Sequence, residues 1–398
     1  MNLSNRAVNA APFYALVFGE QAAALERQGH RVIKLSIGEP DFGAPPVVLD
    51  AMREIMDGRP LPYTAALGLP ALRHAIAQFY RDQHDVEVDP SRVVITSGAS
   101  AALLLVTAAT TDPGDEVMMA DPCYPCNRQL VESFGANARL VPASAETRFQ
   151  LDAASVRAHW TDRTRSVLIA SPSNPTGTSI PHHELAAICN VARERGKWRV
   201  VDEIYLNLSD HDDRGKPPQS ALAIDPDAIV INSFSKYFGM TGWRLGWCVV
   251  PDTLVSAMER LAMNYFLCAS APAQLAALAC FTPEALAVCE KRRLELLQRR
   301  RFVLEGLTRL GLSVPAVPDG AFYVYFDVRR TGLSSWEFCE RVLREAHVAL
   351  TPGKDFGHHT ADTHVRLSYA ASMDELREGM ARLDAFLATL GTPGDRHA

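Results

Sequence analysis

The sequence predicts an α/β protein: a doubly wound sheet flanked by helices, together with a smaller α+β unit. Short β-branched runs alternate with helical patterns through the middle of the chain, which is typical of a sheet with helices on both faces. The chain has 398 residues, more than one typical domain holds, so two domains are expected. Beyond Pro283 a long helical pattern precedes scattered strands and helices, which indicates the second unit.

The individual elements are expected from local patterns. Apolar runs predict strands at 93–95, 167–169, 200–201, 229–231 and 245–250, and periodic patterns predict helices at 70–83, after Gly98 and from Pro283 to near Gly311. The smaller unit should hold strands within 320–328 and 364–370, a helix within 334–348 and a final helix. An N-terminal helix around 13–28 could pack on either domain or on another subunit. The tail, 391–398, should fray.

Charge and apolarity limit the kinds of partner. A net charge of −6 argues against a nucleic-acid or anionic-membrane surface, and the basic runs 291–293 and 299–301 are interpreted as a solvated helix face. The longest apolar stretch, AALLLVTAAT, is shorter than the ~18 residues of a membrane span, and there is no signal-peptide core. We therefore expect a cytoplasmic protein that binds neither membranes nor nucleic acids.

Two of the eight cysteines, Cys123 and Cys126, form a C-x-x-C. A zinc site would need a second pair at zinc-finger spacing, and a redox motif would open a helix; neither pattern is present. Reduced thiols and no bound metal are the expectation, as is usual in the cytoplasm. Whether the pair has any redox role stays open.

Polar residues follow the expected central strands. In open parallel sheets the ligand crevice lies beyond the carboxyl ends of the strands. Small residues at the start of a helix let backbone N–H groups approach an anion. The residues at these ends are Gly98, Ala99 and Ser100, then Asn174, then Asp202 with Tyr205, and finally Lys236 with Ser233, Ser235 and Arg244.

The residue types at these ends restrict the ligand. A carboxylate directly after buried valines is costly unless a positive group meets it. The G-x-G-x-x-G pattern of dinucleotide sites and the Walker loop of nucleotide triphosphate sites are both absent. Pyridoxal 5'-phosphate (PLP) needs a lysine for its aldehyde, an acid for its ring nitrogen and donors for its phosphate. The set therefore favours PLP as the cofactor.

The motifs SPSNPTG, VDEIY, SFSKYFGMTGWRLGW and VRLSYA, in this order, closely resemble those of the fold-type I, class I/II aminotransferases. The stretches GEPDF, PYTAALGLPALR, SGASAAL and DPGDEV extend the resemblance over nearly the whole chain. It implies a large PLP-binding domain at 46–284 with a mostly parallel seven-stranded sheet, and a small domain formed by 1–45 and 285–398. It also implies amino-group transfer between an L-amino acid and a 2-oxo acid with ping-pong kinetics, in a homodimer.

The resemblance implies a role for each matching residue. Lys236 would hold PLP as an internal aldimine and move the proton, while Asp202 would pair with the ring nitrogen. Tyr205 and Asn174 would bind the ring oxygen, and Tyr124 would stack on the ring. The phosphate would lie among Gly98, Ala99, Ser100, Ser233, Ser235 and Arg244, with Tyr63 reaching across to the phosphate of the neighbouring subunit. Arg366 would bind the substrate carboxylate beside Asn174 and Gly38.

Three positions leave the substrate open. Cys123 stands where glycine is frequent in the family and Asn127 where an aromatic residue is frequent, so the outer wall of the pocket is uncertain. Ser100 stands where some aspartate-specific relatives carry lysine, so a neutral or aromatic donor is supported at least as well as aspartate. The motifs also fit a C–S β-lyase, a cyclopropane-forming (ACC-synthase-like) enzyme or a decarboxylase on the same scaffold. A non-catalytic transaminase-like sensor is the alternative of a different class.

Overall fold

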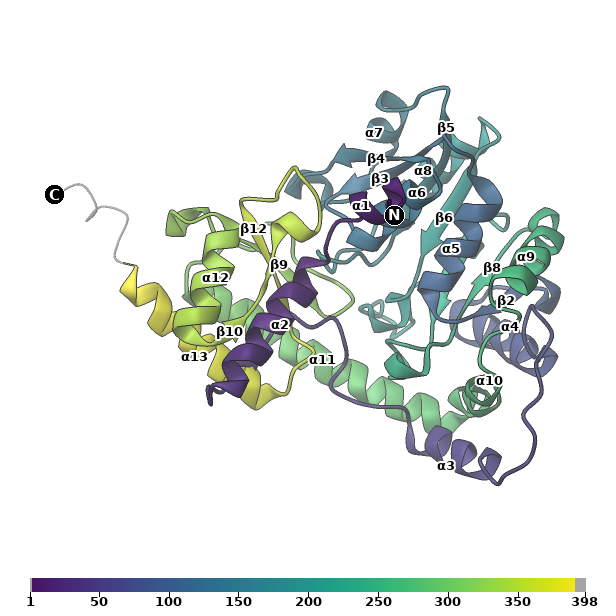
Figure 1. Ribbon diagram of the computed structural model, residues 1–398, viewed down its shortest axis with the longest axis horizontal. Coiled ribbons are helices and arrows are strands. Elements are labelled where there is room, and N and C mark those ends of the chain that lie inside the picture. Colours follow the sequence, from purple (N-terminus) through teal and green to yellow (C-terminus); the bar gives the residue numbers. More distant parts are fainter. Residues whose placement is uncertain (1, 391–398) are drawn as a thin grey trace.

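The computed structural model describes residues 2–390, so the tail expected to fray, 391–398, lies outside the described residues. A seven-stranded sheet forms the centre of the larger part (Figure 1), with the order β2-β8-β7-β6-β5-β3-β4. Its strands are β2 (Val93–Thr96), β3 (Glu116–Asp121), β4 (Asn137–Pro142), β5 (Thr164–Ala170), β6 (Trp198–Asp202), β7 (Ile229–Ser233) and β8 (Gly246–Val249). β8 runs antiparallel to both of its neighbours, and the other pairs are parallel.

Helices cover both faces of this sheet, as the alternating pattern predicts. They are α4 (Pro70–His84), α5 (Ala99–Thr110), α6 (Pro125–Ser133), α7 (Ala153–Ala158), α8 (His182–Arg193) and α9 (Asp252–Tyr265). α3 (Pro46–Ile55) and α10 (Ala271–Ala277) pack against each other, and α10 also contacts α4. Successive residues of a strand point to opposite faces. In β7, Val230 accordingly packs into the core that contains α4 and α8, whereas Ile229 and Ile231 pack into the core that contains α5 and α9.

The parallel central strands end at one edge of the sheet. Asp202, the last residue of β6, pairs with Ala170 of β5 on one side and with Ile231 of β7 on the other. The loops that follow these three strands therefore begin side by side, and this is where an open α/β sheet binds its ligand. The strands at 116–121 and 137–142 were not among those expected from the sequence, because charged and polar residues interrupt their apolar pattern.

The smaller part is an α+β unit. Its antiparallel sheet has the order β11-β12-β9, and β1 pairs with β10 in a separate parallel ribbon. The strands are β1 (Ile33–Lys34), β9 (Tyr323–Asp327), β10 (Val348–Ala349), β11 (Thr351–Pro352) and β12 (His364–Ser368). The helices outside the larger sheet are α1 (Asn5–Asn9), α2 (Tyr14–Arg27), α11 (Pro283–Arg309), α12 (Ser335–Ala346) and α13 (Met373–Thr389). The domain boundaries near 46 and 285 stay a prediction.

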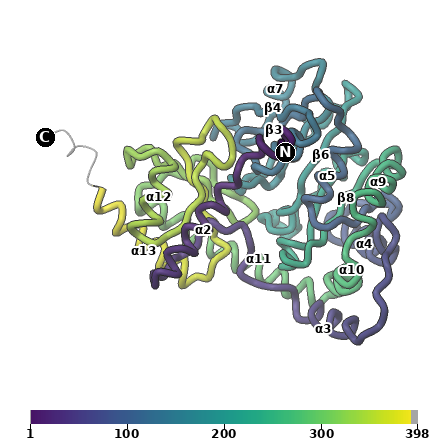
Figure 2. Tube along the Cα trace, in the orientation of Figure 1, coloured from purple at the N-terminus to yellow at the C-terminus, as the bar shows by residue number. Residues whose placement is uncertain are grey.

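The N-terminal helix packs on the smaller unit. α2, drawn purple in Figure 1, contacts β10, β11 and the 3-10 turn Gly353–Asp355, which answers where the helix at 13–28 lies in this chain. The residues before α2 lie against the larger part of the molecule (Figure 2). There the backbone N–H of Ala11 donates to Gln129 Oε1 of α6 at 3.2 Å. The N-terminal segment therefore contacts both parts of the molecule.

The interpretation of the basic runs on α11 as a solvated face was wrong for Arg293 and Arg299, whereas Lys291 and Arg301 are exposed. Arg293 and Arg299 are each only 4% exposed. The guanidinium of Arg299 donates to Asp41 Oδ1 at 2.8 Å and to the carbonyl oxygen of Ala370 at 3.0 Å. Because Asp41 belongs to the connector between β1 and α3, this arginine fixes the connector to the long helix. Arg292 donates likewise to the carbonyl oxygen of Gly43 at 2.8 Å.

Within residues 2–390, no single helix is long and apolar enough to cross a bilayer; the pair Ala271–Phe281 and Pro283–Arg309 passes on length and composition together, but is bent by 81°.

We expect Arg299→Ala to lower the free energy of unfolding by about 2 kcal/mol, because a buried cation and its charge-assisted hydrogen bonds to Asp41 and Ala370 are lost. Urea unfolding followed by circular dichroism measures this. Arg301→Ala is the matched control, because Arg301 is exposed on the same helix, and we expect a change within about 0.5 kcal/mol. Equal effects of the two substitutions would contradict the structural role of Arg299.

Candidate active site

A cavity of about 490 Å³ lies at the carboxyl ends of β5, β6 and β7 and is closed by residues of the smaller unit. It brings together most of the residues predicted from the sequence. The predicted residues on its wall are Gly38, Ala99, Ser100, Tyr124, Asn174, Asp202, Tyr205, Ser233, Ser235, Lys236, Arg244 and Arg366. Gly98 lies directly behind Arg244, and Tyr63 is 79% exposed and away from the wall.

Lys236 is held inside the cavity by the connector that follows β1. Its Nζ donates a hydrogen bond to the carbonyl oxygen of Gly38 at 2.6 Å. Burial lowers the pKa of the Lys236 ammonium to about 8; the positive charges of Arg366 and Arg244 act in the same direction, whereas Glu39 and Asp202 oppose the shift. A lysine with this pKa has a sizeable neutral fraction near neutral pH, which a nucleophile or a base requires.

Asp202 ends β6 with its side chain buried. Burial raises the pKa of its carboxyl to about 6, although the backbone N–H of Ile204 donates to Oδ1 at 3.0 Å and the charge of Lys236 stabilises the anion. A carboxylate without water around it is stabilised by a positive or protonated partner. Asp202 can therefore pair with a protonated nitrogen placed in the cavity.

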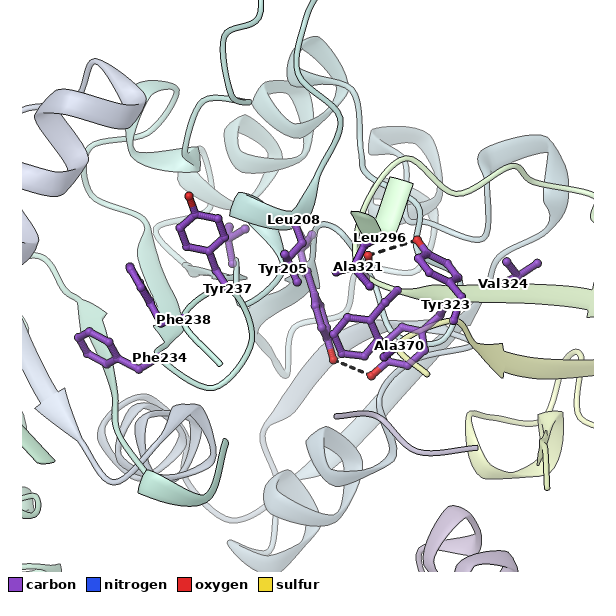
Figure 3. Close-up of a cluster of buried hydrophobic side chains, with 14 of the residues drawn as sticks. Tyr205, Leu208, Phe234, Tyr237, Phe238, Leu296, Ala321, Tyr323, Val324 and Ala370 are labelled. Carbon is purple, nitrogen blue, oxygen red and sulfur yellow. Dashed lines mark hydrogen bonds between the residues drawn. The ribbon is translucent and has the colours of Figure 1, made fainter. Parts of the chain in front are cut away.

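Two tyrosines lie together on the cavity wall. The hydroxyls of Tyr205 and Tyr323 are 2.8 Å apart and share a hydrogen bond, which Figure 3 shows as a dashed line. Burial raises the pKa of Tyr205 well above its ordinary value, so its hydroxyl stays protonated. Tyr323 comes from β9 in the smaller unit, and a Cβ on Gly38 would lie only 2.7 Å from its oxygen. The absence of a side chain at 38 thus allows Tyr323 to approach the backbone that holds Lys236.

Arg366 lies on β12, is 1% exposed, and is held by hydrogen bonds from both of its terminal nitrogens. Nη1 donates to Asn174 Oδ1 at 2.8 Å, and Nη2 donates to the carbonyl oxygen of Ser36 at 2.6 Å. The guanidinium lies over the Tyr323 ring, 4.5 Å from its centroid. Nε has no partner among the described residues. The guanidinium is therefore a positioned planar cation in the cavity wall, the geometry that binds a carboxylate through two parallel hydrogen bonds.

Donors for an anion gather at the other end of the cavity. The hydroxyls of Ser233 and Ser235 are 2.9 Å apart, and Arg244 faces the start of α5. Gly98 has φ +84°, and a Cβ there would lie 2.7 Å from Arg244 Nη2, so only glycine lets the arginine come so close. The first backbone N–H groups of a helix have no intrahelical acceptor, and those of α5 begin at Ala99. Together these groups fit a phosphate.

Several cavity residues were not predicted from the sequence. They are Phe13, Leu16, Ser36, Ile37, Glu39, Leu103, Thr241 and Tyr323, among others. Cys123 and Asn127, which were expected to affect the outer wall, are buried and do not line the cavity. Cys123 and Cys126 both carry free thiols. The apolar part of the wall includes Phe13 and Leu16 of the N-terminal segment together with Leu103 of α5, and no local sequence pattern marks the N-terminal segment as part of a site.

Comparison with known proteins agrees with this geometry. The family described as aminotransferase class I and II matches residues 30–383. The chain belongs to this family of aminotransferases. A valine–pyruvate aminotransferase of Mycobacterium tuberculosis is 39% identical over 377 residues, 94% of this chain and 96% of its own length. A crystal structure of an aminotransferase from the same organism has a TM-score of 0.93 at 38% identity, covering 98% of this chain and all (100%) of the other. The Thermus thermophilus aspartate aminotransferase with maleate has a TM-score of 0.91 at 34% identity, covering 97% and 100%.

The protein is therefore an enzyme that transfers amino groups, and its family generally depends on PLP. The donor set of the cavity fits that cofactor: a buried amine for an aldehyde, a buried carboxylate for a ring nitrogen, and two hydroxyls, an arginine and a helix start for a phosphate. The alternatives on the same scaffold would use the same donors, so the family match rather than the donor set identifies the reaction as transamination.

We expect the reactivity of Lys236 in cofactor-free aminotransferase to rise with pH through about 8, because burial lowers the pKa of its ammonium. Below that pH the amine is protonated and inert, and above it the reaction rate levels off. Carbamylation by cyanate, read at Lys236 by mass spectrometry, measures the profile, with the exposed Lys216 as an internal reference for the reagent. A midpoint near the ordinary lysine pKa of ~10.4 would contradict the effect of burial.

We expect Arg366→Lys to lower kcat/KM for amino donors by about 10²-fold to 10³-fold. The single ammonium of lysine cannot hold Asn174 and Ser36 and still present two parallel N–H groups to a carboxylate. Steady-state kinetics measure the loss, and the exposed Arg301→Lys is the matched control. An unchanged kcat/KM would exclude Arg366 from substrate binding.

Proposed function

We propose that this transaminase binds PLP through Lys236 and transfers amino groups from apolar L-amino acids to a 2-oxo acid by a ping-pong mechanism. The observation that carries the proposal is that one cavity brings together the partly buried Lys236 with the buried Asp202 and Arg366. Amine, carboxylate and guanidinium supply the three charges that a PLP-bound amino acid requires. Tyr205, Asn174, Ser233, Ser235, Arg244 and the start of α5 keep the roles expected for them, and Tyr124 that of a stacking partner.

PLP supplies, when bound, a conjugated ring that accepts the electron pair released from the substrate Cα. The carboxylate of Asp202 would keep the ring nitrogen protonated, since a buried anion without that proton would be unpaired. Tyr205 would donate its hydroxyl proton to the ring oxygen. The Nζ of Lys236 would take a proton from one carbon and return it to another, and a pKa of about 8 suits both steps near neutral pH.

The charges on the cavity wall favour a donor with a single carboxylate. Among the described wall residues the cations are Lys236, Arg244 and Arg366. Each of the three already has a role towards the aldehyde, the phosphate or the α-carboxylate, so none is left for a distal carboxylate. Ser100 on α5 supplies a hydroxyl and no charge at the position where lysine occurs in some aspartate-specific relatives. The wall of Phe13, Leu16 and Leu103 is apolar and fits a hydrocarbon side chain.

The names of the two compared relatives support different donors. The M. tuberculosis protein is a valine–pyruvate aminotransferase and the T. thermophilus protein is an aspartate aminotransferase. The apolar wall agrees with the first of them. We therefore propose a neutral donor of the size of valine or larger.

We also propose a cytoplasmic homodimer. Tyr63 is 79% exposed, as a tyrosine that contacts a neighbouring subunit would be before assembly. Free thiols at all eight cysteines agree with a reducing compartment.

A half-reaction screen tests the function. Each L-amino acid is added singly to the PLP-loaded enzyme, and the loss of cofactor aldehyde absorbance is followed. We expect apolar donors such as valine, leucine and phenylalanine to convert the cofactor with a kcat/KM at least about tenfold above that of aspartate, since a charge without a partner costs at least 1.4 kcal/mol. Aspartate as the best donor would overturn the proposed substrate class, and pyruvate with ammonia formed without an acceptor would identify a lyase activity.

Lys236→Ala is the control for this screen. Without the amine we expect no covalent attachment of PLP, no aldehyde band of the bound cofactor and no turnover, because Nζ both holds the cofactor and moves the proton. Intact-mass measurement after borohydride reduction detects the attachment independently of activity. Attachment at another lysine would contradict the role of Lys236.

A further inference from the structure

The first turn of α2 contributes apolar residues to the wall of the cavity. Phe13 and Leu16 line the cavity that contains Lys236, although they belong to the segment that enters α2. The Phe13 ring meets the Tyr124 ring edge-on, with their centroids 6.1 Å apart. Leu16 is 64% exposed even though its helix packs on the smaller unit through Phe18. An exposed leucine at the mouth of a cavity gains most when a hydrocarbon side chain covers it.

This turn has no cap of its own. α2 begins after Phe13, whose side chain cannot accept a hydrogen bond from the first N–H groups of the helix. The carboxylate of Asp355 accepts them instead: the N–H of Tyr14 donates to Oδ1 at 2.8 Å and the N–H of Ala15 donates to Oδ2 at 3.2 Å. Asp355 is more than 300 residues away in the sequence and only 1% exposed. A carboxylate at a helix N-terminus also interacts favourably with the helix dipole.

Asp355 also lies between the two parts of the molecule. Its own carbonyl oxygen accepts a hydrogen bond from Arg128 Nη2 at 3.0 Å, and Arg128 belongs to α6, the helix that starts after Tyr124. Through Asp355, the first turn of α2 is therefore connected to α6, the helix that begins directly after Tyr124, the predicted ring-stacking residue. The ring of Trp336 of α12 contacts two residues of α2: Tyr14 in the first turn, with ring centroids 5.2 Å apart, and Phe18 one turn later, with centroids 5.3 Å apart.

We propose that Asp355 is a positioning residue that holds Phe13 and Leu16 against the cavity and thereby sets the selectivity for large apolar donors. Asp355 does not line the cavity, so it acts through the first turn of α2 and does not touch the substrate. Its charge also interacts with that of Arg366, but Arg366 would hold the same carboxylate of every donor, so this interaction does not change the ratio between donors. This inference rests on the proposed apolar donor class. Loss of the Asp355 carboxylate removes the acceptor from the first N–H groups of α2 and loosens the backbone that carries Phe13, whereas Trp336, which contacts the rings of Tyr14 and Phe18, keeps the helix packed on the smaller unit.

The test compares Asp355→Asn and Asp355→Ala with the wild type as PLP-loaded enzymes. We expect the ratio of kcat/KM for phenylalanine to that for alanine to fall roughly three- to tenfold, the factor that corresponds to loss of an N-cap. The amide hydrogens of Tyr14 and Ala15 should exchange faster by a similar factor in enzyme without substrate, whereas those of the later turns should not. Asparagine has the same shape as aspartate and tests the charge if the alanine variant does not fold.

Asp152→Ala is the matched control. Asp152 caps α7 by accepting from the N–H of Ser155 at 2.6 Å, and α7 does not line the cavity. It should lose comparable helix-capping energy without any change in the donor ratio.

Each failure has its own signature. If the wild type uses no large apolar donor, the proposed donor class is wrong and the role of Asp355 falls with it. If the wild type uses such donors and both Asp355 variants lose phenylalanine and alanine activity equally, only the role of Asp355 is overturned. Unchanged exchange at Tyr14 and Ala15 also overturns it.

Discussion

The charge states of the cavity depend on the burial of two opposite charges, Asp202 and Lys236, at the ends of neighbouring strands. Asp202 ends β6 and Lys236 follows β7, and the pairing of Asp202 with Ile231 brings both to one edge of the sheet. Burial raises the pKa of Asp202 to about 6 and lowers that of Lys236 to about 8, but does not reverse their order. Both groups are therefore mainly charged near neutral pH, with a minor neutral fraction of Lys236.

One stretch of backbone connects Lys236 with the buried Arg366. The carbonyl oxygen of Gly38 accepts from Lys236, and that of Ser36, two residues earlier, accepts from Arg366. The connector is fixed on both sides: Arg299 holds Asp41, and the loop after Lys236 approaches so closely that a Cβ on Gly239 would lie 2.4 Å from the oxygen of Gly43. The distance between the Lys236 amine and the Arg366 guanidinium is thus set mainly by hydrogen bonds to this backbone.

The sequence predicts the parts of the fold and site that leave a local signature. Asp202 directly follows two valines, and Lys236 stands five residues after the apolar run 229–231, so both can be predicted to lie near the carboxyl ends of central strands. Strand 116–121 has no such signature, because Glu116 and Asp121 bracket its apolar residues. Arg299 looks like any helical surface arginine until its acceptor Asp41, 258 residues earlier, packs against it. Tyr323, similarly, is one of several aromatic residues in β9, and only tertiary packing brings it to Tyr205.

The apolar residues Phe13 and Leu16 and the charged groups of the cavity come from different elements. Lys236, Asp202 and Arg366 are fixed by loops of the large sheet, β12 and the connector, whereas Phe13 and Leu16 are fixed by Asp355 at the start of α2. The edge-on contact of Phe13 with Tyr124 is a direct link between the two sets. A change in the first turn of α2 can therefore alter which side chains fit without breaking the bonds that hold the reacting groups.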